Sequence, residues 1–381
     1  MNIAGQKSGL SWAVNISVVL LVALWLFPTV GLLVSSFRTS DQISTSGWWK
    51  AMFPSQQNLT LRSDAPELQV QEGDLYVIEG LLFADGKDVE ISVWGVSSRE
   101  IDSYSAGETA PLKKGGEVTV QADGRYRMVN TEPFTGTRGT RIFVTATTPP
   151  EFTLRNYQHV LFDPSNSEGM AKAFINTLTV TIPATIIPIV IAAFAAYALA
   201  WMEFPGRALL IAVIVGLLVV PLQLALIPLL KLHNEVGIGK GYLGAWLAHT
   251  GFGLPLAIYL LRNYMVGLPR DIIENARVDG ATEFQIFVKI ILPLSFPALA
   301  SFAIFQFLWT WNDLLVALVF LIDSTGDTTV MTKQIVELLG TRGGNWEILA
   351  TSAFVSIAVP LMVFFAMQKY LVRGLLAGSV K

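Results

Sequence analysis

The sequence of 381 residues contains no cysteine and only three histidines. The absence of cysteine excludes disulfide bonds, thiolate zinc sites and cysteine nucleophiles. The histidines, His159, His233 and His249, stand apart from one another, so we expect no metal site and no cofactor. Charge is also scarce, because 14% of the residues are charged against about 25% in soluble proteins. This argues against an ordinary cytosolic enzyme, and a net charge of −3 gives no support for nucleic-acid binding.

The few charges are distributed unevenly. Residues 62–148 hold 14 acidic and 9 basic side chains, whereas the other 294 residues hold 32 charges in total. One stretch therefore has the composition of a soluble domain, and the rest has the composition of membrane-embedded chain. We place the domain boundaries accordingly: residues 1–57 form the start of the chain with a first span, 58–150 form an insertion, and 151–381 form a membrane core.

Long apolar runs recur outside the insertion. About 20 apolar residues are needed to cross a hydrocarbon core of roughly 30 Å, and such a run must be helical because lipid offers no partner for an unpaired amide. The sequence predicts an all-α membrane protein with six spanning helices and an inserted extracytoplasmic β domain. The first run is too long for a cleaved signal, so we interpret it as a retained span. The six expected spans are 12–34, 178–201, 208–230, 243–261, 294–321 and 348–367.

The distribution of lysine and arginine predicts the orientation of these spans. If the N-terminus lies inside, the inner segments hold nine basic residues and the short outer loops hold four. Positive charge is enriched on the cytoplasmic side of membrane proteins. We therefore expect both termini in the cytoplasm and residues 58–150 outside. Arg38 and Lys50 weaken the signal at the first span, whose orientation depends on the others.

The insertion has the alternating pattern of β-strands separated by turn residues. Asp123-Gly124 between two such stretches indicates a hairpin, and Asp85-Gly86 indicates a second turn. We expect a β-sandwich or barrel of five or more strands that supports the fold or docks a partner. The expected strands include 75–83, 89–96, 118–121, 125–129 and 141–147.

The loop between the fourth and fifth spans, 262–293, predicts two short helices joined by a sharp turn. Pro269 and Asp271 mark a helix start, and Gly280 stands where a left-handed residue ends a helix. Thr282 and Gln285 resemble a capping box that opens the next helix. These residue patterns alone leave two interpretations of the loop open. It is either a rigid protruding element suited to docking or a plain interfacial loop.

The same loop resembles the Glu-Ala-Ala…Gly…Ile-x-Leu-Pro signature of bacterial ABC importer permeases. The spacing agrees throughout, and the one departure is Asn275, where the signature has an alanine. Stretches 152–157, 309–313 and 369–381 are similar to the sugar-importer branch, of the maltose type, and the large external insertion resembles the alpha-glucoside permeases. The matching residues are Glu274, Asn275, Ala276, Gly280, Ile290, Leu292 and Pro293.

The resemblance implies a permease that imports an oligosaccharide, an alpha-glucoside such as maltose, sucrose or trehalose. Its partners would be a second, different permease, a cytoplasmic ATPase dimer, an external sugar-binding protein, the sugar and membrane lipid. The chain has no Gly-x-x-x-x-Gly-Lys-Ser/Thr motif, so a separate subunit must hydrolyse ATP. The chain itself is then not an enzyme.

Residue roles follow from the same resemblance. The short helix would fit a cleft on the ATPase, with Glu274 facing a basic or polar group and Ala276 and Gly280 allowing close approach. Asp279 would pair with Arg277 or cap the helix locally, and Ala281 completes the turn. The C-terminal tail, 368–381, would extend towards the ATPase dimer interface, and we single out Gly374, Gly378 and Lys381.

The fifth expected span contains the one acidic residue of the six runs. An ionisable group at such depth is costly and by default indicates function. Asp313 and Asn312, with Trp309 and Trp311 as stacking surfaces, could line a sugar path; alternatively they are structural. Prolines within the spans are expected to kink or break their helices, at Pro183, Pro188, Pro221, Pro228, Pro255 and Pro360.

Two other classes of function remain open from sequence. An ion-coupled secondary transporter would require several intramembrane acids and related halves, and we find one acid and no repeat. A membrane-anchored receptor or scaffold using the β domain would require a cytoplasmic output module, yet the longest inner segment is the loop 262–293.

Overall fold

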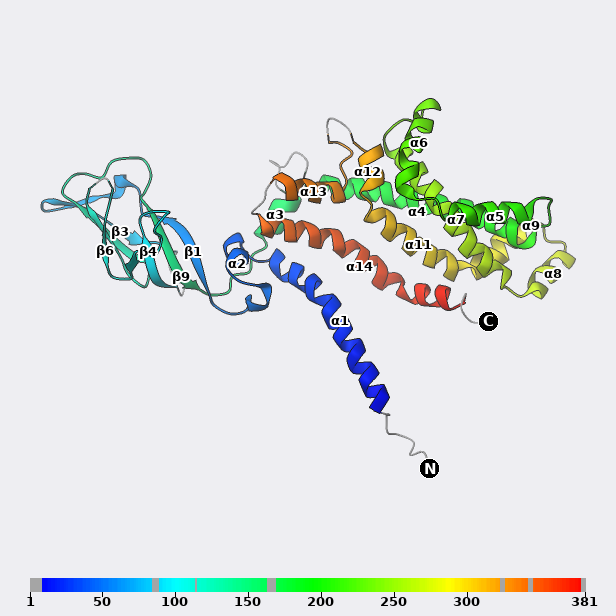
Figure 1. Cartoon of the computed structure of the whole chain (residues 1–381), viewed down its shortest axis with the longest axis horizontal. Helices are drawn as coiled ribbons and strands as arrows, with labels where there is room; N and C mark the ends of the chain where they lie inside the picture. Colours follow the sequence, from blue (N-terminus) through cyan, green and yellow to red (C-terminus); the bar gives the residue numbers. More distant parts are fainter. Residues whose placement is uncertain are drawn as a thin grey trace. The chain divides into compact units, whose positions relative to one another are not determined.

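The computed structural model describes residues 9–83, 89–113, 115–162, 169–322, 326–341 and 345–377. The chain divides into two compact units. One comprises residues 1–157 and 344–351, and contains the first long helix and all the strands of the described chain. The other comprises 158–343 and 352–381 and is helical. Each is described by itself (Figure 1).

The insertion folds as two antiparallel sheets, as its alternating pattern predicts. One sheet has the strand order β1-β9-β4-β5, and the other has the order β2-β3-β8-β7-β6. Along β9, buried residues alternate with more exposed ones, which is the signature of a strand with one face in a core. The strands are β1 (Ser55–Arg62), β2 (Val70–Glu72), β3 (Leu75–Leu81), β4 (Glu90–Gly95), β5 (Tyr104–Ser105), β6 (Thr109–Pro111), β7 (Glu117–Val120), β8 (Arg125–Asn130) and β9 (Arg141–Thr148).

The two sheets share one hydrophobic core, which confirms the sandwich prediction. Trp94 and Ile142 from the first sheet and Met128 from the second are at most 1% exposed and belong to the same cluster. The Trp94 indole donates a hydrogen bond to the carbonyl of Ser105, so its polar atom is satisfied inside the core. The sandwich is therefore a domain with its own core.

The predicted Asp123-Gly124 hairpin is present between β7 and β8. Gly124 has a φ of +86°, a left-handed conformation that glycine adopts readily. The Asp123 carboxylate accepts a hydrogen bond from the backbone of Arg125, which lowers the pKa of Asp123. The other predicted turn, Asp85-Gly86, lies outside the described residues.

The helices of the first unit are few. Those lying wholly within it are α1 (Gly9–Ser36), α2 (Ser40–Thr45), and the 3₁₀ turns η1 (Trp48–Lys50) and η2 (Pro66–Leu68). The remaining helices are α3 (Arg155–Phe162), α4 (Met170–Trp201), α5 (Arg207–Leu217), α6 (Leu222–Glu235), α7 (Tyr242–Val266), α8 (Arg270–Val278), α9 (Glu283–Ile286), η3 (Phe287–Ile291), α10 (Leu292–Leu294), α11 (Phe296–Trp311), α12 (Leu315–Phe320), α13 (Met331–Thr341) and α14 (Trp346–Ala377).

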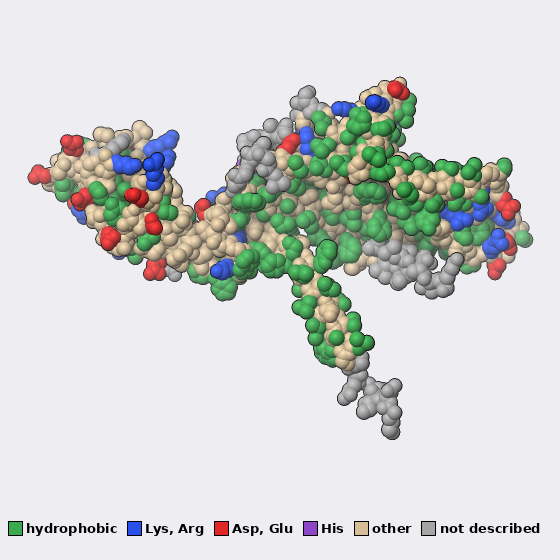
Figure 2. All heavy atoms as spheres, viewed as in Figure 1, with side chains coloured by type: hydrophobic (Ala, Val, Ile, Leu, Met, Phe, Trp, Pro, Cys, Tyr) green, Lys and Arg blue, Asp and Glu red, His purple; other side chains and the backbone are tan. Residues whose placement is uncertain are grey.

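Four of these helices are long and apolar enough to span a membrane alone: α1, α4, α7 and α14. Two bent pairs meet the same test, namely α5 with α6 and the 283–294 segment with α11, so the described residues hold four to six spans. The expected spans are thus present, although two of them are not single helices. Figure 2 shows the helical unit with much hydrophobic surface, and charged side chains near α8 and α9, at the tip of α6 and beside α13.

The expected span over 208–230 is present as a bent pair of helices, broken next to Pro221 as the sequence predicts. The axes of α5 and α6 differ by 110°, and the break lies at residues 218–221. Pro221 stands at the start of α6 and has no N–H to continue the ladder, while the preceding amides form tighter i→i−3 bonds, as Val220 N does to Leu217 O. In α4, by contrast, Pro183 and Pro188 lie inside one continuous helix.

The expected span 294–321 also differs. The helix α11 ends at Trp311, and a separate helix, α12, begins at Leu315. The carboxylate of Asp313 accepts a hydrogen bond from the amide of Val316 at 2.8 Å, which satisfies a free N–H at the start of α12. Asp313 therefore lies in a helix break and not within a span.

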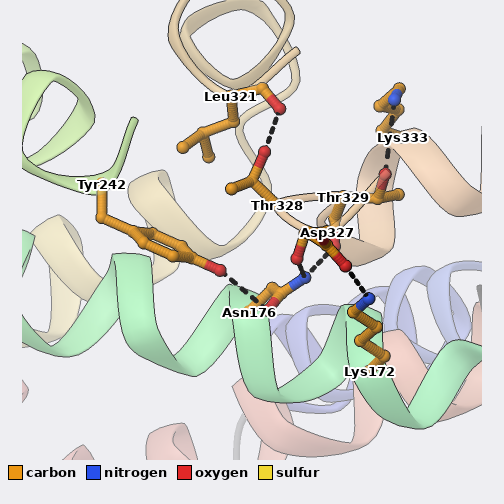
Figure 3. A network of polar contacts seen from close by, with 8 residues as sticks. All are labelled: Lys172, Asn176, Tyr242, Leu321, Asp327, Thr328, Thr329 and Lys333. Carbon is orange, nitrogen blue, oxygen red and sulfur yellow. Dashed lines mark hydrogen bonds and ion pairs between the residues drawn. The ribbon is translucent and has the colours of Figure 1, made fainter. Parts of the chain in front are cut away.

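A buried polar network ties α4 and α7 to the segment between α12 and α13 (Figure 3). The Asn176 side-chain amide donates to the carbonyls of Asp327 and Thr329, both at 2.8 Å, and its oxygen accepts from the Tyr242 hydroxyl at 2.8 Å. Lys172 forms an ion pair with Asp327 beside it. One 7% exposed asparagine thus satisfies backbone carbonyls within residues 326–330, which form neither helix nor strand.

Candidate coupling site and substrate path

The loop between α7 and α11 begins with a short helix, α8, that ends in a complete Schellman motif. Asp279 is the C-terminal cap, and Gly280 follows it with a φ of +82°. The amide of Gly280 donates to the carbonyl of Arg277, and that of Ala281 donates to the carbonyl of Ala276. The predicted helix and its glycine stop are both present. In Figure 1, α8 lies at one end of the helical unit.

The second helix of the loop begins at the predicted capping box. The Thr282 side chain accepts from the amide of Gln285, whose side chain accepts from the amide of Thr282. The chain then passes through a π-helical turn, η3, in which the amide of Leu292 donates to the carbonyl of Phe287. Pro293 follows and cannot donate to the ladder, so the wide turn and the proline interrupt regular α-helix at the same place.

One face of this loop is anchored in the hydrophobic interior. Ile273 of α8 is 1% exposed, and Ile286 and Ile291 are fully buried. They belong to a cluster with small residues of α4, among them Ala196, and with Leu261 of α7. These apolar contacts hold the loop against α4 and α7. Interiors packed at this density are rigid, so the loop and the two helices form one packed body.

A polar brace crosses the glycine turn. The guanidinium Nε of Arg277 lies 2.9 Å from Oε1 of Glu283, and the hydroxyl of Tyr197 in α4 donates to the other carboxylate oxygen. Donating this hydrogen bond to the Glu283 carboxylate raises the pKa of Arg277. Of the two alternatives for Asp279, the structure supports local capping, since the ion pair of Arg277 is with Glu283.

The opposite face of the loop is exposed. Glu274, Asn275 and Gly280 are all exposed, and no other atom lies within 4 Å of where a Cβ on Gly280 would be. Val278 is 86% exposed and Phe284 is 66% exposed, so two large apolar side chains lie among polar ones. Both side chains add apolar surface to a side of the loop that otherwise carries charged and polar residues.

The remaining signature residues lie on the packed side or at the junction with α11. Ala276 and Ala281 are half-buried and pack against the same cluster as Ile273. Ile290 and Leu292 are half-buried, and Pro293 is exposed. The signature therefore combines exposed positions with positions that pack against the helical interior.

Four residues of this site were missed by sequence reasoning: Tyr197, Val278, Glu283 and Phe284. The exposure of Val278 could have been predicted from the sequence. At helical spacing it lies outside the apolar face that Ile273 and Ala276 define. Tyr197 had none, because it lies 86 positions before Glu283 in the chain.

The two candidate tryptophans occupy different environments. Trp309 is 47% exposed and lines a cavity of about 780 Å³, together with residues around the α5–α6 break and with α7. Trp311 is 1% exposed, and its indole donates to the carbonyl of Ser356 at 2.9 Å. Trp311 also stacks on Phe307, so it is a packing residue in this structure.

The polar pair beside them has structural partners. The Asn312 amide is exposed and donates to the carbonyl of Leu308, which it caps at the end of α11. The Asp313 side chain is 7% exposed, caps α12, and lies 4.0 Å from Nε2 of His249 in α7. The structure thus brings Asp313 and His249 together, a pairing that the sequence did not indicate.

The structure does not describe the side chains of the candidate tail positions. Gly374 belongs to the end of α14, where only the backbone is described, and Gly378 and Lys381 lie outside the described residues.

Comparison with known proteins identifies the family. Residues 173–376 match the family described as the inner membrane component of binding-protein-dependent transport systems. This chain belongs to that family. The match includes α4, the coupling loop and most of α14, and therefore every described helix that the site uses. It makes the chain a multi-pass inner-membrane permease of an ABC importer, whose ATPase is a separate subunit, and it excludes the secondary-transporter and receptor alternatives.

Curated relatives of the permease extend the similarity. The alpha-glucoside transport system permease protein AglG of Rhizobium meliloti (strain 1021) is 62% identical over 99% of this chain and 98% of its own length. The osmoprotective compounds uptake permease protein GgtD of Synechocystis sp. is 59% identical over 61% of this chain and 76% of its own. The trehalose transport system permease protein SugB of Mycobacterium tuberculosis is 34% identical over 61% and 84%.

Among solved structures, the permease is similar to a chain of a bacterial ABC transporter involved in the import of the acidic polysaccharide alginate. The TM-score is 0.48 at 22% identity, over 59% of this chain and 81% of that one.

Proposed function

We propose that this permease imports an alpha-glucoside such as maltose, sucrose or trehalose. The observation that carries the substrate class is the 62% identity with the Rhizobium alpha-glucoside permease, which spans the insertion as well as the membrane core. The permease would receive the sugar from an external binding protein and release it into the cytoplasm when a cytoplasmic ATPase dimer closes and reopens.

A second, different permease would complete the translocation path as a heterodimer partner. The excess of basic residues on the inner segments supports cytoplasmic termini, with residues 58–150 outside. In this orientation Arg38 is a basic residue near the outer end of α1, against the general trend, but its side chain is 2% exposed. Its guanidinium donates to the carbonyls of Gln42 and Ser46, so it serves the fold of the following segment and not the topology.

The exposed face of α8 would dock in a cleft of the ATPase subunit. Glu274 supplies a charge to this face, Val278 supplies apolar area, and Gly280 keeps the turn narrow. The remaining coupling positions, Asn275, Ala276, Asp279, Ala281, Ile290, Leu292 and Pro293, shape the helix and its junction with α11. The tail residues Gly374, Gly378 and Lys381 would contact the ATPase dimer interface.

The cavity beside Trp309 is the candidate substrate path of this subunit. Its volume falls within the range of small-molecule sites, about 300–1,000 Å³, and most of its lining is apolar with Gln223 as one polar group. An indole face suits the apolar side of a pyranose ring. Trp311, Asn312 and Asp313 would shape this path indirectly, because their polar atoms have structural partners.

Uptake assays test this function. A strain that lacks the gene, complemented with the wild-type permease, should accumulate labelled alpha-glucosides, and unlabelled alpha-glucosides should compete while beta-glucosides should not. Glu274→Lys should abolish uptake while the protein remains in the membrane at normal amounts. The matched variant Glu235→Lys, at the end of α6, should transport normally. Complementation without any alpha-glucoside uptake would contradict the proposed substrate.

A further inference from the structure

The chain between α1 and the first strand exposes a compact apolar turn. We define residues 47–53 as the aromatic turn. It contains Trp48 and Trp49, and Trp49, Met52 and Phe53 are 60%, 72% and 65% exposed. The turn has one charged residue, Lys50, and no acid. So much contiguous apolar surface is unfavourable in water and indicates a covered surface.

The aromatic turn packs against the side of α1 itself. The ring of Trp48 lies 4.6 Å from that of Phe27, and the ring of Trp49 lies 6.3 Å from it. A Cβ on Gly31 would come within 2.6 Å of the Trp48 indole nitrogen, so the absence of a side chain creates the notch that Trp48 fills. Gly31 precedes the end of α1 by five residues, or about 7.5 Å of helix rise.

Hydrogen bonds from the buried Arg38 stabilise the reversal of the chain between α1 and the aromatic turn. Arg38 donates through Nη2 to the carbonyl of Gln42 at 2.7 Å and through Nη1 to that of Ser46 at 3.0 Å. A capping box at Thr39 starts α2 between them. The reversal therefore depends on specific hydrogen bonds and places the turn beside the spanning helix.

We propose that the aromatic turn lies in the lipid headgroup region, at the boundary with the acyl chains, and anchors the leaflet end of α1 to the bilayer. The turn is continuous with a helix that has only 6% of its most apolar 18-residue window buried within this chain, and it contacts that helix about one and a half turns inside its end. Tryptophan is enriched at this depth because its ring is apolar and its N–H is polar. Lys50 extends its charge to the lipid phosphates, as long basic side chains do.

The anchor has a consequence for the β domain. Strand β1 starts at Ser55, two residues after Phe53. Fixing the aromatic turn at the membrane surface therefore fixes the depth at which the sandwich begins. Figure 2 shows hydrophobic side chains gathered where α1 meets the segment around α2.

Spin labels test the location directly, because the chain has no cysteine of its own. Met52→Cys and Phe53→Cys would be labelled in the intact transporter in lipid nanodiscs, and collisions with oxygen and with a water-soluble nickel complex would be measured. Controls are Leu21→Cys, exposed in the middle of α1, and Asp102→Cys, exposed in the sandwich. We expect the oxygen-to-nickel ratio at 52 and 53 to lie several-fold above that at 102 and below that at 21.

Two results would overturn the proposal. A ratio at 52 and 53 equal to that at 102 would place the turn in water. Protection from both reagents would place it against another protein, such as a second permease. A further variant tests the notch: Gly31→Leu should move the ratio at 52 towards that of 102, whereas Gly9→Leu, where a Cβ meets nothing within 4 Å, should not. An unchanged ratio in Gly31→Leu would contradict the role of Trp48.

Discussion

Arg277 and Glu283 form an ion pair across the turn at Gly280, with 2.9 Å between Nε and Oε1. Because Tyr197 of α4 donates to the same carboxylate, one side chain joins the coupling helix to a spanning helix. The loop therefore contacts α4 through a polar link as well as through apolar packing.

Removing the charge of Glu283 should impair transport more than stability. Glu283→Gln weakens both links, yet the pair is about 40% exposed and such pairs contribute only ~0.2–1 kcal/mol to folding. We expect a several-fold loss of ATP-driven uptake at unchanged amounts of protein in the membrane, and a similar loss in Tyr197→Phe. Glu203→Gln, an exposed acid just after α4, is the control. Normal uptake in both variants would remove the brace from the mechanism.

Gly280 should tolerate a side chain poorly for conformational reasons alone. A Cβ there meets no atom within 4 Å, but the left-handed backbone costs a non-glycine residue roughly 1–2 kcal/mol. Gly280→Val should reduce uptake and retention of the ATPase subunit, and Gly280→Asn should be milder because asparagine visits this conformation. Gly216→Ala in α5, equally unobstructed but helical, should be neutral. Equal activity of all three variants would show that the turn is not required.

Val278 should contribute to ATPase docking through its apolar area. Burying a valine side chain contributes about 1.5–3 kcal/mol, and each 1.4 kcal/mol is about tenfold in affinity. We expect Val278→Asp to weaken retention of the ATPase subunit by at least tenfold in co-purification. The control is Val236→Asp, since Val236 is 60% exposed at the end of α6. Equal retention in the two variants would place the docking surface elsewhere.

Asn176 should matter for stability of the membrane core. Asn176→Leu would leave the carbonyls of Asp327 and Thr329 without their buried donor, at a cost of about 1–3 kcal/mol each. We expect the melting temperature of the detergent-solubilised permease to fall by several degrees. Lys172→Ala, which removes the largely exposed ion pair of the same network, should change it little. If Lys172→Ala lowered the melting temperature more than Asn176→Leu did, the ion pair and not the asparagine would be the main stabilising contact.

Local signals made much of the coupling loop predictable. The glycine stop and the Thr282 capping box depend on neighbouring residues, and both were located correctly from sequence. The Asp123-Gly124 hairpin was predictable for the same reason. These motifs satisfy their own backbone groups, so tertiary context has little influence on them.

Features that depend on distant contacts were not predictable. Hydropathy gave one span over 294–321, because it does not register that Asp313 caps a new helix. Trp309 and Trp311 have equivalent sequence signals, yet one lines a cavity and the other is buried against α14. The Tyr197–Glu283 contact joins segments far apart in sequence, and no periodicity reveals it.

Photocrosslinking from position 278 tests most directly whether a separate ATPase subunit holds α8. A photoreactive amino acid at position 278, in the assembled transporter in native membranes, should crosslink to the ATP-binding subunit, and the same probe at position 236 should not. Absence of that product at 278 from an intact, transport-active complex, or an equal yield at 236, would contradict the account.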